Sequence, residues 1–141
     1  MSMSESATTQ SVSIRSFILA KEAEAISDVD RPTIFGETEW SAPVMFGVAR
    51  LPKNIVDGLW EQHDQGDEIL VVIAGNFTFR LQLPDGQIAE RDAAAGDMVV
   101  VPKGYPHSFR VHSEELQILF VTPKDGNHGW SERGGPVDRH R

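Results

Sequence analysis

The sequence predicts an all-β protein that folds as one small antiparallel barrel or sandwich. Many short apolar segments follow one another, and Gly, Pro or acidic turn residues separate them at close spacing, a pattern typical of such folds. Long stretches with the 3.6-residue periodicity of a helix are missing. The length of 141 residues suits a single domain with one core and a pocket, rather than two independent domains.

Both ends of the chain are expected to hold little regular structure. Residues 1–13 are rich in Ser and Thr, which predicts a disordered N-terminus. Residues 14–26 mix apolar side chains with Lys and Glu and predict a short strand followed by a helical turn, and residues 28–38 predict a loop. Residues 126–141 are polar and Gly-rich, which predicts a flexible C-terminal tail.

Strands are expected from residue 44 onward, within a single barrel domain that spans residues 14–125. The clearest signal lies over residues 76–83, where apolar and polar residues alternate as in a half-buried strand. A hairpin turn follows at residues 84–86, where Pro presets φ and Gly accepts a positive φ. Further strands are predicted over residues 44–49, 69–74, 87–92, 98–101, 107–112 and 116–122.

The composition excludes several classes of function. The net charge of −8 would repel a nucleic-acid backbone. The chain has no Cys, so disulfides, thiolate metal sites and a Cys nucleophile are excluded. No apolar stretch has the length of a membrane span, and the first residues lack the apolar core of a secretory signal. We therefore expect a cytoplasmic protein without a nucleic-acid or membrane partner.

Two segments carry side chains that can converge as metal ligands. Glu61 and His63 are two residues apart, so both point to the same side of a strand. A turn at residues 64–67 would return the chain and bring Glu68 beside them on the next strand. His107 heads a later strand, directly after a turn that contains Pro and Gly. Imidazoles and carboxylates in one small space can bind a divalent first-row metal, so we predict a metal-sized cluster of these four side chains.

Apolar residues are expected to line a pocket beside this cluster. Leu70 and Val72 follow the glutamate on its face of the strand, and Phe109 and Val111 follow the histidine of the later strand. Such walls favour an aromatic, keto or otherwise uncharged small molecule over a sugar phosphate.

These two segments resemble the two sequence motifs of the cupin superfamily, in particular those of the small single-domain type known as cupin 2. The matching positions are His63, Glu68 and Gly75 in the first motif and Gly96, Pro102, Gly104 and His107 in the second. Glu61 occupies the place of the first motif's first histidine, and Val111 that of the second motif's final Asn. Gly58 lies closer to the histidine position than the family pattern asks.

The resemblance implies an antiparallel double-stranded β-helix, or jelly-roll barrel, with one metal ion inside it. By position, the ligands would be Glu61, His63, Glu68 and His107. A set of two imidazoles and two carboxylates suits divalent Fe, Mn, Ni or Zn. Alternatively, Glu61 swings away and leaves two histidines and one carboxylate, a set that suits oxygen chemistry.

The resemblance favours a metal-dependent enzyme that acts on a small, mostly uncharged molecule, of the oxygenase, isomerase or cyclase type. The metal would act as a Lewis acid on a substrate oxygen. No catalytic residue is assigned, although Glu61 and Tyr105 are candidates. The alternative is a non-catalytic module that binds or senses a small molecule. A third interpretation is a metal-free barrel in which the two glutamates only hydrogen-bond the two histidines.

An apolar outer surface is also predicted. The outward-facing members of Ile69, Val71 and Ile73 need a cover, because bare apolar patches are rare on monomers. Either a second subunit, which would make the protein a homodimer, or the N-terminal segment would supply that cover.

Overall fold

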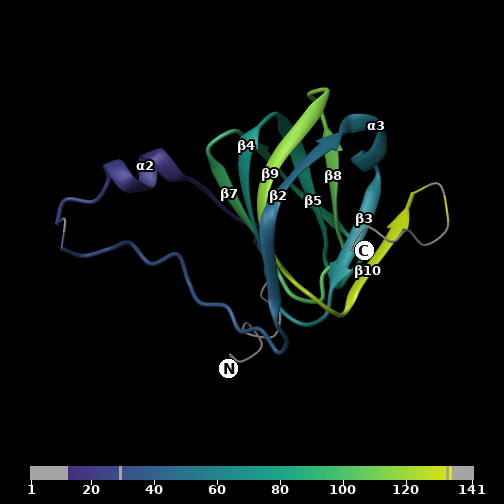
Figure 1. Ribbon diagram of the computed structural model, residues 1–141, viewed down its shortest axis with the longest axis horizontal. Coiled ribbons are helices and arrows are strands. Elements are labelled where there is room, and N and C mark those ends of the chain that lie inside the picture. The colour runs from purple at the N-terminus through teal and green to yellow at the C-terminus, as the bar shows by residue number, and fades with distance from the viewer. Residues whose placement is uncertain (1–12, 29, 133, 135–141) are drawn as a thin grey trace.

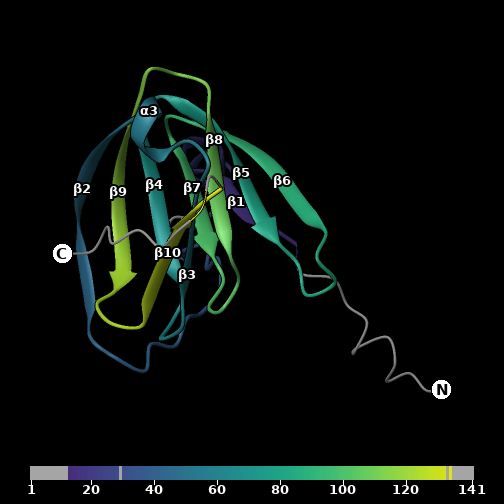
Figure 2. The same cartoon turned by 90° about the vertical axis from the view of Figure 1, so that its right-hand side faces the viewer.

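Two antiparallel sheets face each other and enclose the core of the protein (Figures 1 and 2). The computed structural model describes residues 13–28, 30–132 and 134. The first sheet has the strand order β1-β7-β4-β9-β2, and the second has the order β10-β3-β8-β5-β6. From β7 onward each strand lies in the sheet opposite to its predecessor, which is the alternation of a jelly-roll. The predicted all-β barrel is therefore confirmed.

The strand bounds agree closely with the predicted ones. The first sheet contains β1 (Arg15–Ile18), β7 (Asp97–Val101), β4 (Glu68–Ala74), β9 (Glu115–Pro123) and β2 (Val44–Pro52). The second contains β10 (Asn127–Ser131), β3 (Leu59–His63), β8 (His107–Val111), β5 (Asn76–Gln82) and β6 (Ile88–Ala94). Two short helices complete the described elements, α2 (Leu19–Glu24) and α3 (Lys53–Val56).

The core lies between the sheets, and β5 shows how the alternation of apolar residues in the sequence predicts one buried strand face. Phe77, Phe79 and Leu81 are fully buried, whereas the residues between them are only partly buried. A period of two along a strand sends alternate side chains to opposite faces, so this strand presents one apolar face to the interior. The predicted half-buried strand is confirmed.

Gly75 joins β4 of the first sheet to β5 of the second. Its φ is +94°, a conformation that side chains disfavour. A Cβ at this position would lie 2.5 Å from the carbonyl oxygen of Glu115. A glycine is required here because the chain crosses between the sheets in close contact with the start of β9.

The flexible tail predicted from residue 126 is wrong for residues 127–131. These residues form β10, which pairs antiparallel with β3 (Figure 1). The segment has no period-two apolar pattern, and its strand conformation comes from pairing with the edge of β3, where Trp130 lies opposite Trp60. The barrel therefore extends beyond the predicted limit at residue 125. The rest of the predicted tail (residues 133 and 135–141) and residues 1–12 of the predicted disordered N-terminus lie outside the described residues.

The N-terminal strand and helical turn predicted over residues 14–26 are confirmed as β1 and α2. β1 adds to the edge of the first sheet by pairing with β7. α2 projects from the barrel and has no buried residue (Figure 1). None of the helices in the described ranges is long and apolar enough to cross a membrane.

Candidate metal centre

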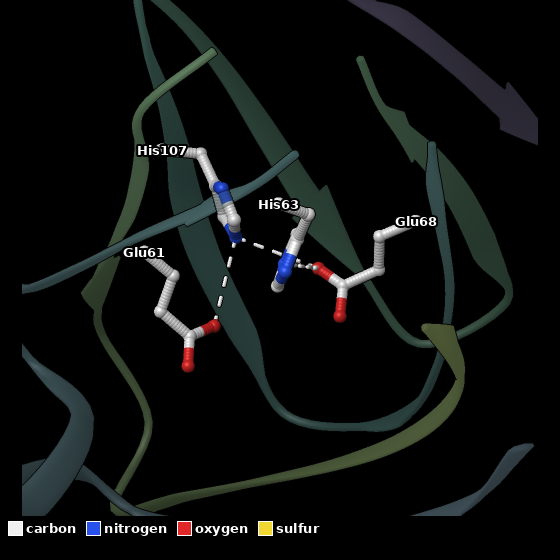
Figure 3. Close-up of side chains that lie close together, drawn as sticks. All are labelled: Glu61, His63, Glu68 and His107. Atoms are coloured by element: carbon white, nitrogen blue, oxygen red, sulfur yellow. Dashed lines mark hydrogen bonds and ion pairs between the residues drawn. The ribbon is translucent and has the colours of Figure 1, made fainter. Parts of the chain in front are cut away.

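Four side chains with ligand atoms meet inside the barrel (Figure 3). Glu61 and His63 come from β3, His107 from β8, and Glu68 from β4 of the facing sheet. One nitrogen or carboxylate oxygen of each residue lies within 4.8 Å of those of the other three. The structure thus brings together all four residues that the sequence predicted to converge.

Strand geometry accounts for this convergence. Glu61 and His63 alternate with Gln62 along β3, so their side chains share a face. Antiparallel pairing of β3 with β8 places Glu61 directly opposite His107. The turn after β3 leads into β4, where Glu68 is the first residue and reaches the same point from the other sheet.

The ligand atoms face one another at short range. His63 Nε2 lies 3.1 Å from Glu68 Oε1. His107 Nε2 lies 3.4 Å from the same oxygen and 3.7 Å from Glu61 Oε1. The two glutamates approach the imidazoles from opposite sides (Figure 3). Two carboxylates therefore flank two imidazole nitrogens, and the space between them suits a cation.

His107 lacks the hydrogen bonds that a buried imidazole normally makes. Its side chain is 1% exposed, yet neither ring nitrogen makes a well-directed hydrogen bond to a described residue, and Nε2 only approaches the two carboxylates at longer range. Such orphaned buried polar atoms are uncommon in native proteins and often mark a missing ion or water. The donor set and this orphaned imidazole both fit a metal ion.

The pKa values show the same preference for positive charge. Burial disfavours the charged imidazolium of His107, but Glu61 and Glu68 outweigh burial and raise its pKa to about 9. Burial likewise disfavours the charged carboxylate of Glu68, but His107 and His63 outweigh it and lower its pKa to about 2. The Glu68 carboxylate stays negative and favours a positive charge beside it, whether a proton or a metal ion carries it.

Two further residues contact the cluster from outside, and sequence reasoning missed both. Thr122 of β9 donates a hydrogen bond from Oγ1 to Glu68 Oε2 at 2.6 Å. Asn127 of β10 lies with Oδ1 2.7 Å from Nδ1 of His63. Thr122 ends a predicted strand and Asn127 lies in the predicted tail, so no motif signalled either one.

The cluster opens on an apolar cavity of about 280 Å³. Leu70 and Phe109 line this cavity as predicted, and Glu61 and Glu68 form part of its wall. Val72 and Val111 are not among its lining residues and belong to the packed core instead. The remaining walls, which the prediction missed, come from Met45, Ala49 and Leu51 of β2 and from Ile118, Phe120 and Thr122 of β9. Alternation along β2 placed its three residues on one face, but the sequence did not show that this face points inward.

The other candidate residues lie apart from the cluster. Tyr105 is partly buried and packs against the core without lining the cavity. His128 is exposed and lies with Nε2 2.6 Å from Asp64 Oδ2. His112 is also exposed and contacts Thr78 Oγ1 through Nε2 at 2.8 Å. Of the candidate catalytic residues, only Glu61 contacts the cavity.

Comparison with curated proteins finds an enzyme with a similar segment. Over 72 residues the chain is 36% identical to acireductone dioxygenase from two strains of Rhodopseudomonas palustris. The aligned segment is 51% of this chain and 42% of the relative, so the chain spans less than half the length of these enzymes.

Solved structures with the same fold include two oxalate decarboxylases. The enzyme from Lactobacillus farciminis, solved as a formate complex, superposes with a TM-score of 0.52 at 17% identity, over 61% of this chain and 26% of that one. The Bacillus subtilis enzyme, described for its Mn(II) centres, superposes with a TM-score of 0.50 at 18% identity, over 67% and 27%. At this identity the likeness shows the fold alone.

The family assignment rests on sequence, fold and site together. The family described as "Cupin domain" matches residues 47–123, which is more than half of the chain and contains all four residues of the cluster. The jelly-roll of two facing sheets agrees with this match. The chain belongs to the cupin family.

Proposed function

We propose that Glu61, His63, Glu68 and His107 bind one divalent metal ion, and that the protein is an enzyme acting on a small, mostly uncharged organic molecule. The observation that carries the proposal is a buried cluster of two imidazoles and two carboxylates that opens on an apolar cavity. Polar groups converging beside an apolar pocket are a common form of active site.

The donor set suits divalent Fe, Mn, Ni or Zn, because imidazole nitrogens and carboxylate oxygens are ligands that all four accept. When bound, such an ion would supply Lewis-acid polarisation of a substrate oxygen. Glu61 is the ligand best placed for a second role. Its side chain is 15% exposed and lines the cavity, so it can also accept a proton from a bound molecule.

Charge balance supports an uncharged substrate. Two carboxylates would cancel the charge of a divalent ion, which leaves no net attraction for an anion. The lining of the cavity contains no Lys or Arg, and apart from the two glutamates and Thr122 it is apolar. A neutral molecule with an apolar body and one or two oxygen atoms fits these walls. Of the expected reaction types, the similarity to a dioxygenase supports oxygenation.

Metal analysis of the purified protein tests the site. We expect stoichiometric metal in the wild type after exposure to Fe, Mn, Ni or Zn, and loss of that metal in His63→Ala and His107→Ala. His112→Ala is the matched control, because this histidine is exposed and distant from the cluster in the fold. A wild type that takes up none of the four metals would refute the proposed site.

Oxygen uptake distinguishes an enzyme from a binding module. The metal-loaded protein would be incubated with a panel of phenols and diketones, which carry oxygen atoms on an apolar body. Turnover of one compound that is lost in His107→Ala supports the enzyme. Binding without turnover across the panel would instead show the alternative, a cupin that holds or senses a small molecule.

We further propose a homodimer formed through the outer face of the first sheet. Phe46 and Val48 of β2 are 81% and 69% exposed, and Leu119 of β9 and Ile73 of β4 add exposed apolar surface to the same sheet. Contiguous apolar surface of this kind is typical of protein interfaces. A second copy would bury this surface, as the sequence predicted for β4.

A further inference from the structure

The ring of His63 is held from both sides. Nε2 faces Glu68 Oε1 in the cluster at 3.1 Å, and Nδ1 faces Asn127 Oδ1 at 2.7 Å. Asn127 lies directly opposite His63 in the antiparallel pairing of β10 with β3. The side-chain contact between Asn127 and His63 therefore follows from the register in which these two strands pair.

The hydrogen bonds of Asn127 determine which atom of its amide faces the ring. Nδ2 lies 2.9 Å from the carbonyl oxygen of Pro123 and 3.3 Å from that of Lys124. Carbonyl oxygens only accept hydrogen bonds, so the NH2 group must point to them and Oδ1 must point to His63. An amide oxygen is also only an acceptor, and the facing Nδ1 must therefore carry a hydrogen.

This arrangement selects the nitrogen that His63 presents to the cluster. With Nδ1 committed to Asn127, Nε2 is the nitrogen that faces Glu68 and the cluster. Without a metal, the hydrogen bond to the Glu68 carboxylate needs a hydrogen on Nε2, and a bound metal would replace that hydrogen and take the Nε2 lone pair. A metal-bound histidine commonly has its other nitrogen held by such an acceptor, which sets both tautomer and ring orientation. His107 has no corresponding hydrogen bond among the described residues, so this support is particular to His63.

The position of Asn127 is itself well anchored. The backbone N–H of Asp64, at the end of β3, donates to the carbonyl oxygen of Gly126 at 3.0 Å. Asn127 through Ser131 then pair with β3 along its whole length. The acceptor for His63 is thus held by a strand and by two hydrogen bonds of its own side chain.

We propose that Asn127 is a positioning residue that keeps the hydrogen of His63 on Nδ1 and directs Nε2 into the cluster, so that β10 completes the metal site. The inference rests on the proposed metal site. It assigns β10, which lies outside both cupin motifs and outside the family match, an indirect part in binding through His63.

Metal affinity of Asn127 variants tests this role. Asn127→Leu keeps a similar side-chain size but removes the acceptor, and we expect it to weaken Zn²⁺ binding about 10- to 100-fold. Asn127→Asp keeps an acceptor oxygen and should stay within a few-fold of wild type even if it lowers the melting temperature. His128→Ala is the matched control, because its exposed side chain belongs to the adjacent position of β10 and should leave affinity unchanged.

Nitrogen NMR of the zinc-loaded wild type tests the tautomer without any variant. We expect His63 to show a protonated Nδ1 and a metal-bound Nε2. Coordination through Nδ1, or equal affinity in wild type and Asn127→Leu, would overturn the inference while leaving the metal site intact. A wild type that binds no metal would refute the proposed function instead. Even then, the hydrogen on Nδ1 remains measurable in the metal-free protein, and its absence would overturn the positioning role.

Discussion

Glu61 would determine the charge of the proposed metal site. It stands where the resemblance to cupins places a histidine, and the structure brings it within 3.7 Å of His107 Nε2. A divalent ion with two carboxylates and two neutral imidazoles has no net charge, whereas one carboxylate and three imidazoles would leave one positive charge. In the proposed metal site, this single side chain would therefore change the preference from anions to neutral molecules.

Replacing Glu61 should admit anions. We expect Glu61→His and Glu61→Gln, once loaded with Zn²⁺, to bind oxalate on the order of tenfold or more tightly than wild type, because each adds one positive charge close to the ligand. Calorimetric titration with oxalate measures the change. Gln removes the negative charge without introducing an imidazole, so Glu61→Gln separates the effect of the charge from the effect of the ligand type. Unchanged oxalate binding in both variants, at full metal content, would contradict the charge argument.

The cluster should make the stability of the metal-free protein depend on pH. The pKa of His107 is raised from 6.5 to about 9, so its stabilising contribution is complete below pH 6.5 and is lost as the pH rises through 9. The pKa of Glu68 is lowered from 4.5 to about 2, so its contribution is complete above pH 4.5 and is lost as the pH falls through 2. These two groups together predict greatest stability between pH 4.5 and 6.5.

Denaturant unfolding after chelator treatment measures this dependence. The unfolding midpoint should fall as the pH rises from 6.5 to 9. In His107→Gln the same fall should be smaller, because the group that loses its proton is gone. A wild-type midpoint that stays level over this range would contradict the raised pKa of His107.

At the scale of elements, β10 pairs with β3 and, through Asn127, contacts His63 of the cluster. The turn that precedes it depends on Gly126, whose φ is +77° and whose missing Cβ would lie 2.7 Å from Gln65 Cγ. This close approach places the start of β10 against the turn after β3, and so brings Asn127 opposite His63. A strand without an apolar pattern thereby acquires a defined register.

Gly126→Ala should disturb both stability and metal binding. The left-handed backbone alone costs about 1–2 kcal/mol for a residue with a Cβ, and the contact with Gln65 adds to it. Gly86→Ala is the matched control, because φ is +89° but nothing lies within 4 Å. Thermal unfolding should show a loss in both variants, whereas Zn²⁺ affinity should fall only in Gly126→Ala. Equal Zn²⁺ affinity in the two variants would show that metal binding does not depend on the exact position of β10.

At the scale of the whole molecule, the outer face of the first sheet exposes contiguous apolar surface, which a monomer rarely leaves in contact with water. Phe46 and Val48 of β2 lie opposite Val121 and Leu119 of β9, so the apolar surface is continuous across neighbouring strands. Of the N-terminal segment, the described part contributes β1, which lies at the edge of this sheet opposite to β2. The cytoplasmic location and the lack of a nucleic-acid partner stay predictions from composition.

Placing a charge on this face should dissociate the dimer. We expect the wild type to sediment as a dimer and Phe46→Glu as a monomer, because a buried unpaired carboxylate strongly opposes association. Ile55→Glu is the control: Ile55 is 59% exposed on α3, outside the sheet. Analytical ultracentrifugation distinguishes the two states. A wild type that is monomeric at all concentrations tested would contradict the proposed interface.

The strand pattern and the shared facing of the two cluster residues on β3 were predictable from local rules. Alternation identifies β5, and residues two apart on β3 must share a face, so Glu61 and His63 belong together in any strand pairing. The pocket was predicted only in part, because the same alternation cannot tell which face of a strand points inward. Leu70 and Phe109 were therefore found, whereas the inward face of β2 was not.

Sequence periodicity and spacing were enough to predict a β-barrel and to group Glu61, His63 and Glu68, because these depend on positions close together in the chain. The resemblance to the cupin motifs added His107, which lies much farther along the chain. Only the folded structure revealed the support for that cluster. Asn127 reaches His63 across 64 positions and Thr122 reaches Glu68 across 54. Such contacts arise from the pairing of distant strands, and neither the short polar segment of β10 nor a single Thr carries a local pattern that specifies its partner.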